Sequence, residues 1–196
     1  MIKLQDVKVE YPNFSIGFKE TTLPLNKVTF VTGRNGVGKT TLLKAIAKLL
    51  PYEGTIEYEG FATYHFQEPI LFHRSVKDNI LYPIKIRKKN IEDYQEQLLQ
   101  YASILHIDHL LDRSAKLLSS GEKMKASLLR SILFQPEIIL LDEPTNNLDL
   151  ESIDQLIELI KTLKQDMTFV IVSHNRAFID ALSENIYHLG GTYVHR

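Results

Sequence analysis

Alternating apolar and polar residues in the first part of the chain predict strands with one buried face. The run 27–32 is rich in β-forming residues and leads directly into a glycine-containing stretch. Apolar residues at helical spacing over 39–50 predict a helix that stops at Pro51. The expected strands of this region are 2–9, 14–19, 27–32, 54–60 and 61–66.

The pattern changes near Gln67, where helical spacing replaces the alternation. Ser75 has the character of an N-cap, and 90–105 is amphipathic with acidic residues in its first turn. We therefore expect a mostly helical insertion over roughly 70–117.

Helices and continuous apolar runs alternate in the rest of the chain. The runs are long enough for strands buried on both faces, so we expect a parallel sheet covered by helices on each side. The expected helices are 121–134, 150–163 and 175–183, and the expected strands are 137–143, 167–174 and a final "NIYHL". A length of 196 residues fits one domain with a subdomain inserted.

Composition excludes several classes of function. Lys and Arg total 23 against 24 Asp and Glu, so no basic excess supports direct nucleic-acid binding. The chain has no cysteine, which excludes disulfides and thiolate metal sites. No stretch approaches the roughly 18 apolar residues of a membrane helix. Any membrane connection is therefore expected to go through a partner.

The stretch "GRNGVGKT" at 33–40 fits the pattern G-x-x-x-x-G-K-[ST] in full. Glycines let successive backbone N–H groups turn toward one centre, and the following helix adds its positive N-terminal end. A lysine here lies between the β- and γ-phosphates, and the hydroxyl beside it suits Mg²⁺. The sequence therefore predicts that a nucleoside triphosphate binds at Gly33, Arg34, Asn35, Gly36, Gly38, Lys39, Thr40 and Thr41, with Thr40 also a ligand of Mg²⁺.

Two adjacent acids follow the apolar run "IILL" in "IILLDEP". Asp142, at the carboxyl end of a buried strand, can reach Mg²⁺ through water. Glu143 can point at the γ-phosphate and orient or deprotonate the attacking water. Alone, the pair could be a solvated strand end, but together with the glycine loop the catalytic interpretation is favoured.

The chain resembles the ATP-binding cassette (ABC) ATPases over nearly its whole length. Five motifs occur in the order of that family: "GRNGVGKTT", "FQE", "LSSGE", "IILLDEPTNNLD" and "IVSHN". The resemblance implies an α/β P-loop NTPase fold of ABC type, with a mostly parallel core sheet, N-terminal antiparallel strands and an inserted helical subdomain. It divides the single domain into an ATP-binding core, 1–66 and 118–196, and a helical subdomain over about 67–117.

The resemblance also implies that two cassettes close head to tail around two ATP molecules. Each nucleotide would lie between the glycine loop of one chain and Ser119, Ser120 and Gly121 of the other. The usual signature is L-S-G-G-Q, so Ser120 and Glu122 depart from it. Glu122 adds negative charge near the phosphate, which leaves the strength of closure open. An N-capped helix start is the alternative interpretation of "LSSGE".

Four further residues receive roles from the resemblance. Gln67 would approach Mg²⁺ and the attacking water, and His174 would bond the γ-phosphate and hold Glu143 and water in line. Asp149 would cross the interface between cassettes, or simply begin a helix. Tyr11 would stack on adenine, unless it is a core tyrosine at a strand end.

The partner decides what hydrolysis drives. The first hypothesis is the ATPase subunit of a transporter, recruited to the inner face of the cell membrane by a permease that docks on 67–80. The partners are then a second, identical cassette, the permease and, in an importer, a solute-binding protein. The stretch resembles importer cassettes for oxyanions such as tungstate or molybdate. Ile70, Leu71 and Phe72 could instead pack inside the helical subdomain. The second hypothesis is a soluble factor of the same superfamily that acts on ribosomes.

Overall fold

The computed structural model describes residues 1–190 and 194–195 and shows two compact units. Within the described residues, no helix has both the length and the apolar character needed to cross a membrane. The first unit contains Met1–Tyr64, Pro136–Glu143 and Lys164–Arg196, and the second contains His65–Gln135 and Pro144–Leu163.

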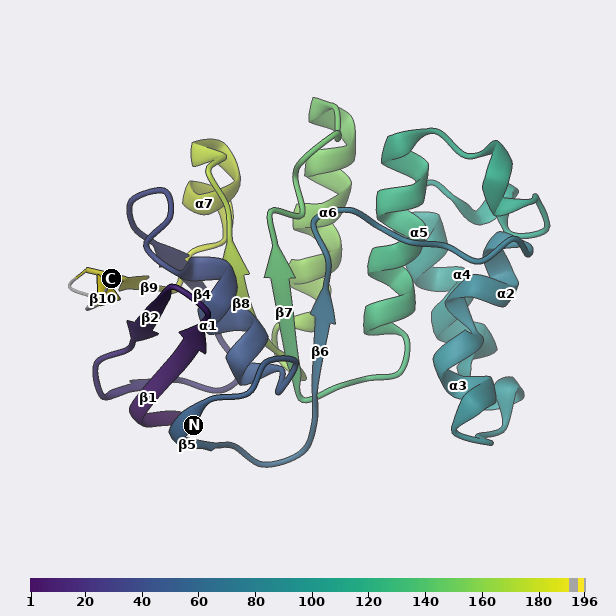
Figure 1. Ribbon diagram of the computed structural model, residues 1–196. Coiled ribbons are helices and arrows are strands. Elements are labelled where there is room, and N and C mark those ends of the chain that lie inside the picture. The colour runs from purple at the N-terminus through teal and green to yellow at the C-terminus, as the bar shows by residue number, and fades with distance from the viewer. Residues whose placement is uncertain (191–193, 196) are drawn as a thin grey trace. The chain divides into compact units, whose positions relative to one another are not determined.

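An antiparallel sheet forms the N-terminal part of the first unit (Figure 1). Its central strand is β1, which pairs with β2, β3 and β5, while β10 pairs with β2. The alternation in β1 buries Ile2, Leu4, Val7 and Val9, as the sequence predicts. The bounds are β1 Ile2–Tyr11, β2 Phe14–Gly17, β3 Thr21–Leu23, β5 Glu53–Glu57 and β10 Val194–His195.

A second sheet has the strand order β6-β7-β8-β4-β9. The pairs β7–β8, β8–β4 and β4–β9 are parallel, and every residue of β7 and β8 is buried. The expectation of a mostly parallel core sheet with N-terminal antiparallel strands is therefore confirmed. The bounds are β4 Val28–Thr32, β6 Ala62–His65, β7 Ile138–Asp142, β8 Thr168–Val172 and β9 Asn185–His188.

Because β4, β7 and β8 are parallel, the predicted nucleotide-site segments that follow them lie at one edge of the sheet. Parallel neighbours end at the same edge of a sheet, so the segments after Thr32, Asp142 and Val172 emerge together. Helix α1 (Lys39–Ile46) contacts β7 and β8. It ends earlier than the expected 39–50 because Lys48 adopts a left-handed backbone with φ 56°.

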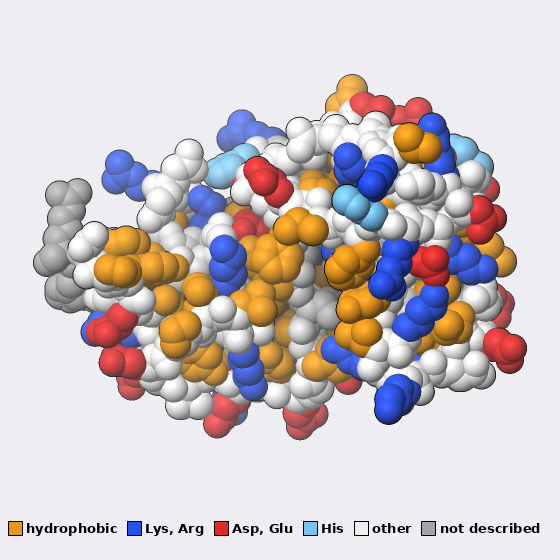
Figure 2. Space-filling view, turned by 45° about the vertical axis from the view of Figure 1, so that its right-hand side comes forward, with side chains coloured by type: hydrophobic (Ala, Val, Ile, Leu, Met, Phe, Trp, Pro, Cys, Tyr) orange, Lys and Arg blue, Asp and Glu red, His pale blue; other side chains and the backbone are white. Residues whose placement is uncertain are grey.

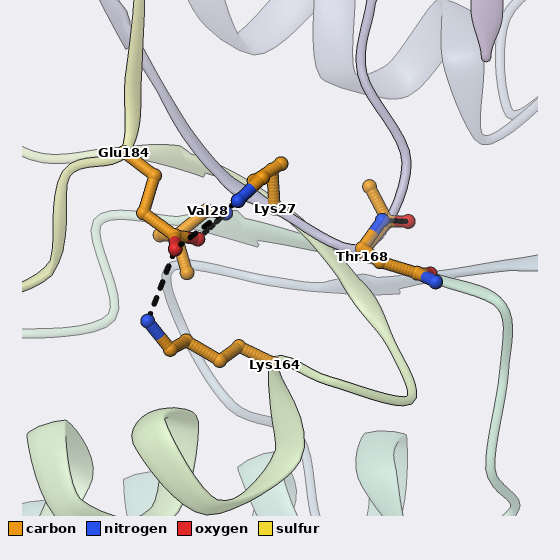
Figure 3. Close-up of polar contacts among 6 residues, drawn as sticks. Lys27, Val28, Lys164, Thr168 and Glu184 are labelled. Atoms are coloured by element: carbon orange, nitrogen blue, oxygen red, sulfur yellow. Dashed lines mark hydrogen bonds and ion pairs between the residues drawn. The ribbon is translucent and has the colours of Figure 1, made fainter.

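An ion-pair cluster lies at the opposite edge of this sheet, where the parallel strands begin (Figure 3). Glu184 accepts a hydrogen bond from the Val28 N–H at 3.1 Å and pairs with Lys164 at 3.1 Å and Lys27 at 3.6 Å. The Val28 N–H, followed by the two lysines, lowers the pKa of the Glu184 carboxyl. The cluster ties the start of β4 to the segment that enters β9.

The second unit is helical, as the sequence predicts for most of it. Ser75 caps α2 by accepting the Asp78 N–H at 3.0 Å, which confirms the predicted cap. Contacts join α2 to α5, and α4 to both α5 and α6. Because α5 and α6 group with the inserted helices, the unit is larger than the predicted 67–117, whose bounds stay a prediction. Its helices are α2 Val76–Ile80, α3 Tyr82–Ile86, α4 Gln95–Ile104, α5 Ser120–Ile132 and α6 Leu150–Leu163. The remaining α7, Arg176–Leu182, belongs to the first unit.

Candidate active site

The glycine loop lies between β4 and α1, and its backbone explains its composition. Gly33 has φ 148°, and a Cβ atom there would lie 2.7 Å from the Leu189 carbonyl oxygen. Gly38 has φ 103° at the N-cap of α1, with Ile16 3.0 Å from where a Cβ would be. A larger residue at either place would be strained. Both positions therefore need glycine for the shape of the loop.

Lys39 is the first residue of α1 and is largely buried, at 8% exposure. Its Nζ donates to the carbonyl oxygens of Gly33 at 3.0 Å and Arg34 at 3.2 Å. The ammonium group thus turns back over its own loop, near the N-terminal end of the helix. Arg34, Asn35, Gly36 and Thr40 are exposed beside it. This arrangement offers positive charge and the N-terminal end of a helix to a phosphate.

Asp142 ends β7 with a side chain that is almost fully buried, at 2% residue exposure. Its Oδ2 accepts a hydrogen bond from the Tyr64 hydroxyl at 2.7 Å. Mg²⁺ is usually bound through one or two carboxylates together with substrate phosphates. The carboxylate of Asp142 and the hydroxyl of Thr40 are hard oxygen donors of the type this ion prefers, so the residues present fit Mg²⁺.

Glu143 follows directly in a left-handed conformation, with φ 51°. Its N–H donates to the Val172 carbonyl at 2.9 Å, which anchors the turn to β8. Burial raises the pKa of the Glu143 carboxyl, and the nearby His174 opposes that rise. A carboxylate with a raised pKa is a better proton acceptor, so the environment suits a general base.

His174 leaves the end of β8 beside that carboxylate. Its backbone N–H donates to Glu143 Oε2 at 3.2 Å, and its ring Nε2 lies 3.3 Å from Oε1. Asn175 follows and caps α7 by accepting the Phe178 N–H. The structure therefore brings together Glu143 and His174, which the sequence separates by the whole of α6.

Tyr11 contacts the glycine-loop helix through its hydroxyl, which lies 3.1 Å from Thr41 Oγ1. Its ring stacks on Phe14, with centroids 4.6 Å apart and planes at 17°. The ring also packs against the core of the first unit, which agrees with the interpretation of Tyr11 as a core residue; its stacking on adenine stays a prediction. Sequence reasoning missed Phe14, although an aromatic residue three positions downstream was a usable signal.

The signature residues start helix α5 in the second unit. Ser119 Oγ accepts the Glu122 N–H at 3.2 Å, and Glu122 Oε2 accepts the Ser119 N–H at 2.7 Å. This capping box confirms the helix-start interpretation. The Ser119 N–H also lowers the pKa of Glu122. The charge of Glu122 is thus directed at its own backbone, which the sequence alone did not reveal.

The other predicted residues of this unit lie as follows. Asp149 Oδ1 accepts the Ser152 N–H at 2.9 Å and so begins α6, which confirms the helix-acid interpretation. Gln67 is exposed in the bend after β6. Gln155, for which the sequence made no prediction, joins α5 to α6, because its Oε1 accepts a hydrogen bond from Lys125 Nζ at 2.6 Å. The interface roles of Asp149 and the signature serines stay predictions, as does the catalytic role of Gln67.

Comparison with known proteins agrees with this geometry. The family model described as ABC transporter matches residues 19–146. The tungstate uptake system ATP-binding protein TupC of Peptoclostridium acidaminophilum is 32% identical, over 96% of this chain and 94% of its own. A solved metal-chelate type ABC transporter in an inward-facing conformation has a TM-score of 0.80 and 27% identity, covering 100% of this chain and 82% of that one.

A second solved structure, the RNase-L inhibitor, has a TM-score of 0.80 and 27% identity. The match covers 96% of this chain but 36% of that protein. The similarity to the Peptoclostridium protein thus extends over nearly the full length of both chains. The similarity to the RNase-L inhibitor covers only about a third of the inhibitor. The chain belongs to the ABC transporter family, as an ATP-binding subunit whose ATPase reaction is coupled to transport.

Proposed function

We propose that this chain hydrolyses ATP with Mg²⁺ inside a closed pair of identical cassettes, and that each closure drives import of a small oxyanion through a separate permease. The observation that carries the proposal is the Glu143–His174 pair, 3.3 Å apart at the strand edge from which the glycine loop also emerges. A base candidate and a phosphate cradle on one edge are the parts that hydrolysis of a terminal phosphate requires.

Each residue has a distinct task in this proposal. Backbone N–H groups of the glycine loop and Lys39 hold the phosphates, while Tyr11 and Thr41 hold the nucleoside end. Glu143 takes a proton from the attacking water, and His174 keeps the carboxylate oriented through its N–H. Thr40 and Asp142 would hold Mg²⁺, which would supply positive charge to neutralise the phosphates. The catalytic role of Gln67 stays a prediction from the sequence.

The second cassette would supply Ser119, Ser120, Gly121 and Asp149 to the nucleotide held by the first. The capping box supports this arrangement, because it fixes the N-terminal end of α5, where N–H groups favour an anion. In the capping box the Glu122 carboxylate accepts a hydrogen bond from the Ser119 N–H, so its negative charge faces that N–H group. Glu122, which replaces the usual glutamine, therefore repels an approaching phosphate less strongly than its charge alone implies.

A groove of about 320 Å³ in the second unit fits the permease partner. Ile70 is 79% exposed and Phe72 42% exposed, which favours a partner surface over packing inside the unit for these two side chains, whereas Leu71 is partly buried. Figure 2 shows exposed hydrophobic side chains flanked by Lys and Arg side chains on its right-hand half. The lining residues are Phe66, Ile70, Phe72, Tyr82, Pro83, Ser127 and Arg130.

The charges around this groove favour one occupant, a short amphipathic permease helix that carries an acidic residue. Arg130 lies in the lining, and the Arg74 guanidinium lies 5.8 Å from the Phe72 ring centroid. A neighbouring pocket adds His73, Lys116 and Lys123. Such a contact would hold the chain at the inner face of the membrane.

The proposal that the transported solute is an oxyanion rests on similarity to the tungstate uptake protein.

The decisive experiment on catalysis is the substitution Glu143→Gln, which keeps the shape of the side chain and removes the base. We expect ATP turnover to fall by about 10²- to 10⁴-fold, the usual contribution of a general base. ATP binding should persist, and an ATP-dependent dimer should accumulate in size-exclusion chromatography. The matched control is Glu158→Gln on an exposed position of α6. Undiminished turnover of Glu143→Gln would reject the assignment.

The permease contact is tested by Ile70→Asp, with Leu99→Asp on exposed α4 as control. The chain should co-sediment with membranes from its own cells, and Ile70→Asp should release it while Leu99→Asp does not. Co-sedimentation with ribosomes instead would favour the alternative of a soluble factor of the same superfamily that acts on ribosomes.

A further inference from the structure

One hydroxyl contact in the first unit is unused by the roles given above. Tyr64, in β6, donates from its hydroxyl to Asp142 Oδ2 at 2.7 Å. The two residues lie on neighbouring strands, β6 and β7. Tyr64 is half-buried and Asp142 is almost fully buried, so the bond is shielded from water. A short bond to an ionised acceptor in such a place is stronger than a neutral one in solvent.

The phenol is held in its donor form. Burial raises the pKa of Tyr64, and the hydrogen bond to Asp142 and the charge of that carboxylate raise it further. Because one Asp142 oxygen accepts the phenol proton in a hydrogen bond, the plane of the carboxylate is fixed relative to the strand.

We infer that Tyr64 is a positioning residue for the divalent ion, which acts by orienting the carboxylate of Asp142. The inference rests on the proposed function, in which Asp142 meets Mg²⁺. A carboxylate on an unrestrained torsion would have to be ordered each time the ion binds. Partners that orient a metal ligand in this way are typically worth 10- to 100-fold in metal affinity or activity.

A merely structural hydrogen bond would stabilise the fold and leave the metal dependence unchanged. The chain offers a matched control for that case. The Tyr58 hydroxyl donates to the Ile46 carbonyl at 2.8 Å, also half-buried and in the same unit. Tyr58→Phe and Tyr64→Phe each remove one oxygen and one hydrogen bond, but only the latter touches Asp142.

The test measures ATP binding by calorimetry in the Glu143→Gln background, where turnover is suppressed. Each variant is titrated in EDTA and then at increasing Mg²⁺. For Tyr64→Phe we expect the affinity for ATP in EDTA to stay within about twofold of the parent. The Mg²⁺ concentration at which ATP affinity reaches half of its Mg²⁺-dependent increase should rise about tenfold or more. Tyr58→Phe should match the parent in both. A parallel titration with Mn²⁺, followed by its electron paramagnetic resonance signal, reports the bound ion directly.

Equal Mg²⁺ midpoints for Tyr64→Phe and Tyr58→Phe would overturn the inference and leave the proposed function standing. A parent protein that binds ATP equally well with and without Mg²⁺ would overturn the metal role of Asp142 itself. Urea unfolding of both variants checks that they are folded. Should Tyr64→Phe be unstable, Tyr64→His, which retains a ring donor, is expected to recover part of the Mg²⁺ sensitivity; failure to recover any in a folded Tyr64→His would also count against the inference.

Discussion

His65 makes the stability of the protein sensitive to mild acid. It ends β6 in a fully buried position, and neither ring nitrogen has a hydrogen-bond partner among the residues that the structure describes. Burial, with the Arg130 charge adding to it, lowers the pKa of His65 from 6.5 to about 4. The ring is therefore neutral in the folded protein, whereas the unfolded chain binds a proton below about pH 6.5.

The sign and size of the effect follow from this difference. Because the folded pKa lies below the unfolded one, acidification favours unfolding as the pH falls through 6.5 toward 4. Between pH 7.5 and pH 5 this single group removes about 2 kcal/mol of unfolding free energy, and about 3 kcal/mol below pH 4. A loss of about 2 kcal/mol is a large part of the stability of an ordinary domain.

The perturbation is His65→Leu, which removes the titrating ring and fills similar space with apolar atoms. Urea unfolding followed by circular dichroism at pH 7.5 and pH 5 gives the loss of stability for each protein. The loss should be smaller in His65→Leu than in wild type by about 2 kcal/mol. The exposed His73→Leu serves as control and should behave as wild type. The same loss in wild type and His65→Leu would refute the reasoning.

Four other outcomes are expected. Lys39→Ala should weaken ATP binding itself, since the ammonium that faces Gly33 and Arg34 is lost; unchanged affinity in equilibrium dialysis would reject the cradle. Ser120→Arg should leave ATP binding to the monomer intact but block the ATP-dependent dimer in light scattering, and normal dimerisation would reject the signature role. Glu122→Ala should cost about 1 kcal/mol at pH 7 in urea unfolding. That difference should vanish as the pH falls through the lowered pKa of Glu122, and a difference independent of pH would contradict the capping box. Gln155→Leu leaves Lys125 Nζ buried without its acceptor and should destabilise the fold by about 1–3 kcal/mol, which a normal thermal midpoint would disprove.

Most strands, most helices and the glycine loop could be predicted because each follows from local pattern, whereas β3 was not expected. Continuous apolar runs identified β7 and β8, and the full G-x-x-x-x-G-K-[ST] pattern identified Gly33 and Lys39. Helix α6 was expected at 150–163 and lies at Leu150–Leu163. The predicted end of α1, residue 50, was wrong by four residues, because the helix ends at Ile46 and nothing in the sequence shows that Lys48 leaves the helical conformation.

Long-range contacts were beyond the reach of sequence patterns. Tyr64 and Asp142 are far apart in the chain and meet because β6 and β7 are neighbours. The stacking of Phe14 on Tyr11 depends on the antiparallel pairing of β1 with β2. Glu122 could be read as extra charge near a phosphate or as part of a cap, and only side-chain geometry separates the two.

The close approach at Gly121 has a consequence for interpreting mutants of this family member. A Cβ atom at that position would lie 3.3 Å from the Asn147 carbonyl oxygen, so even alanine pushes on the loop that follows Glu143. An inactive Gly121→Ala protein would thus report either a blocked nucleotide or a displaced loop. Ser120, exposed on the same turn, separates the two explanations, because a side chain there reaches outward without disturbing residues 144–149.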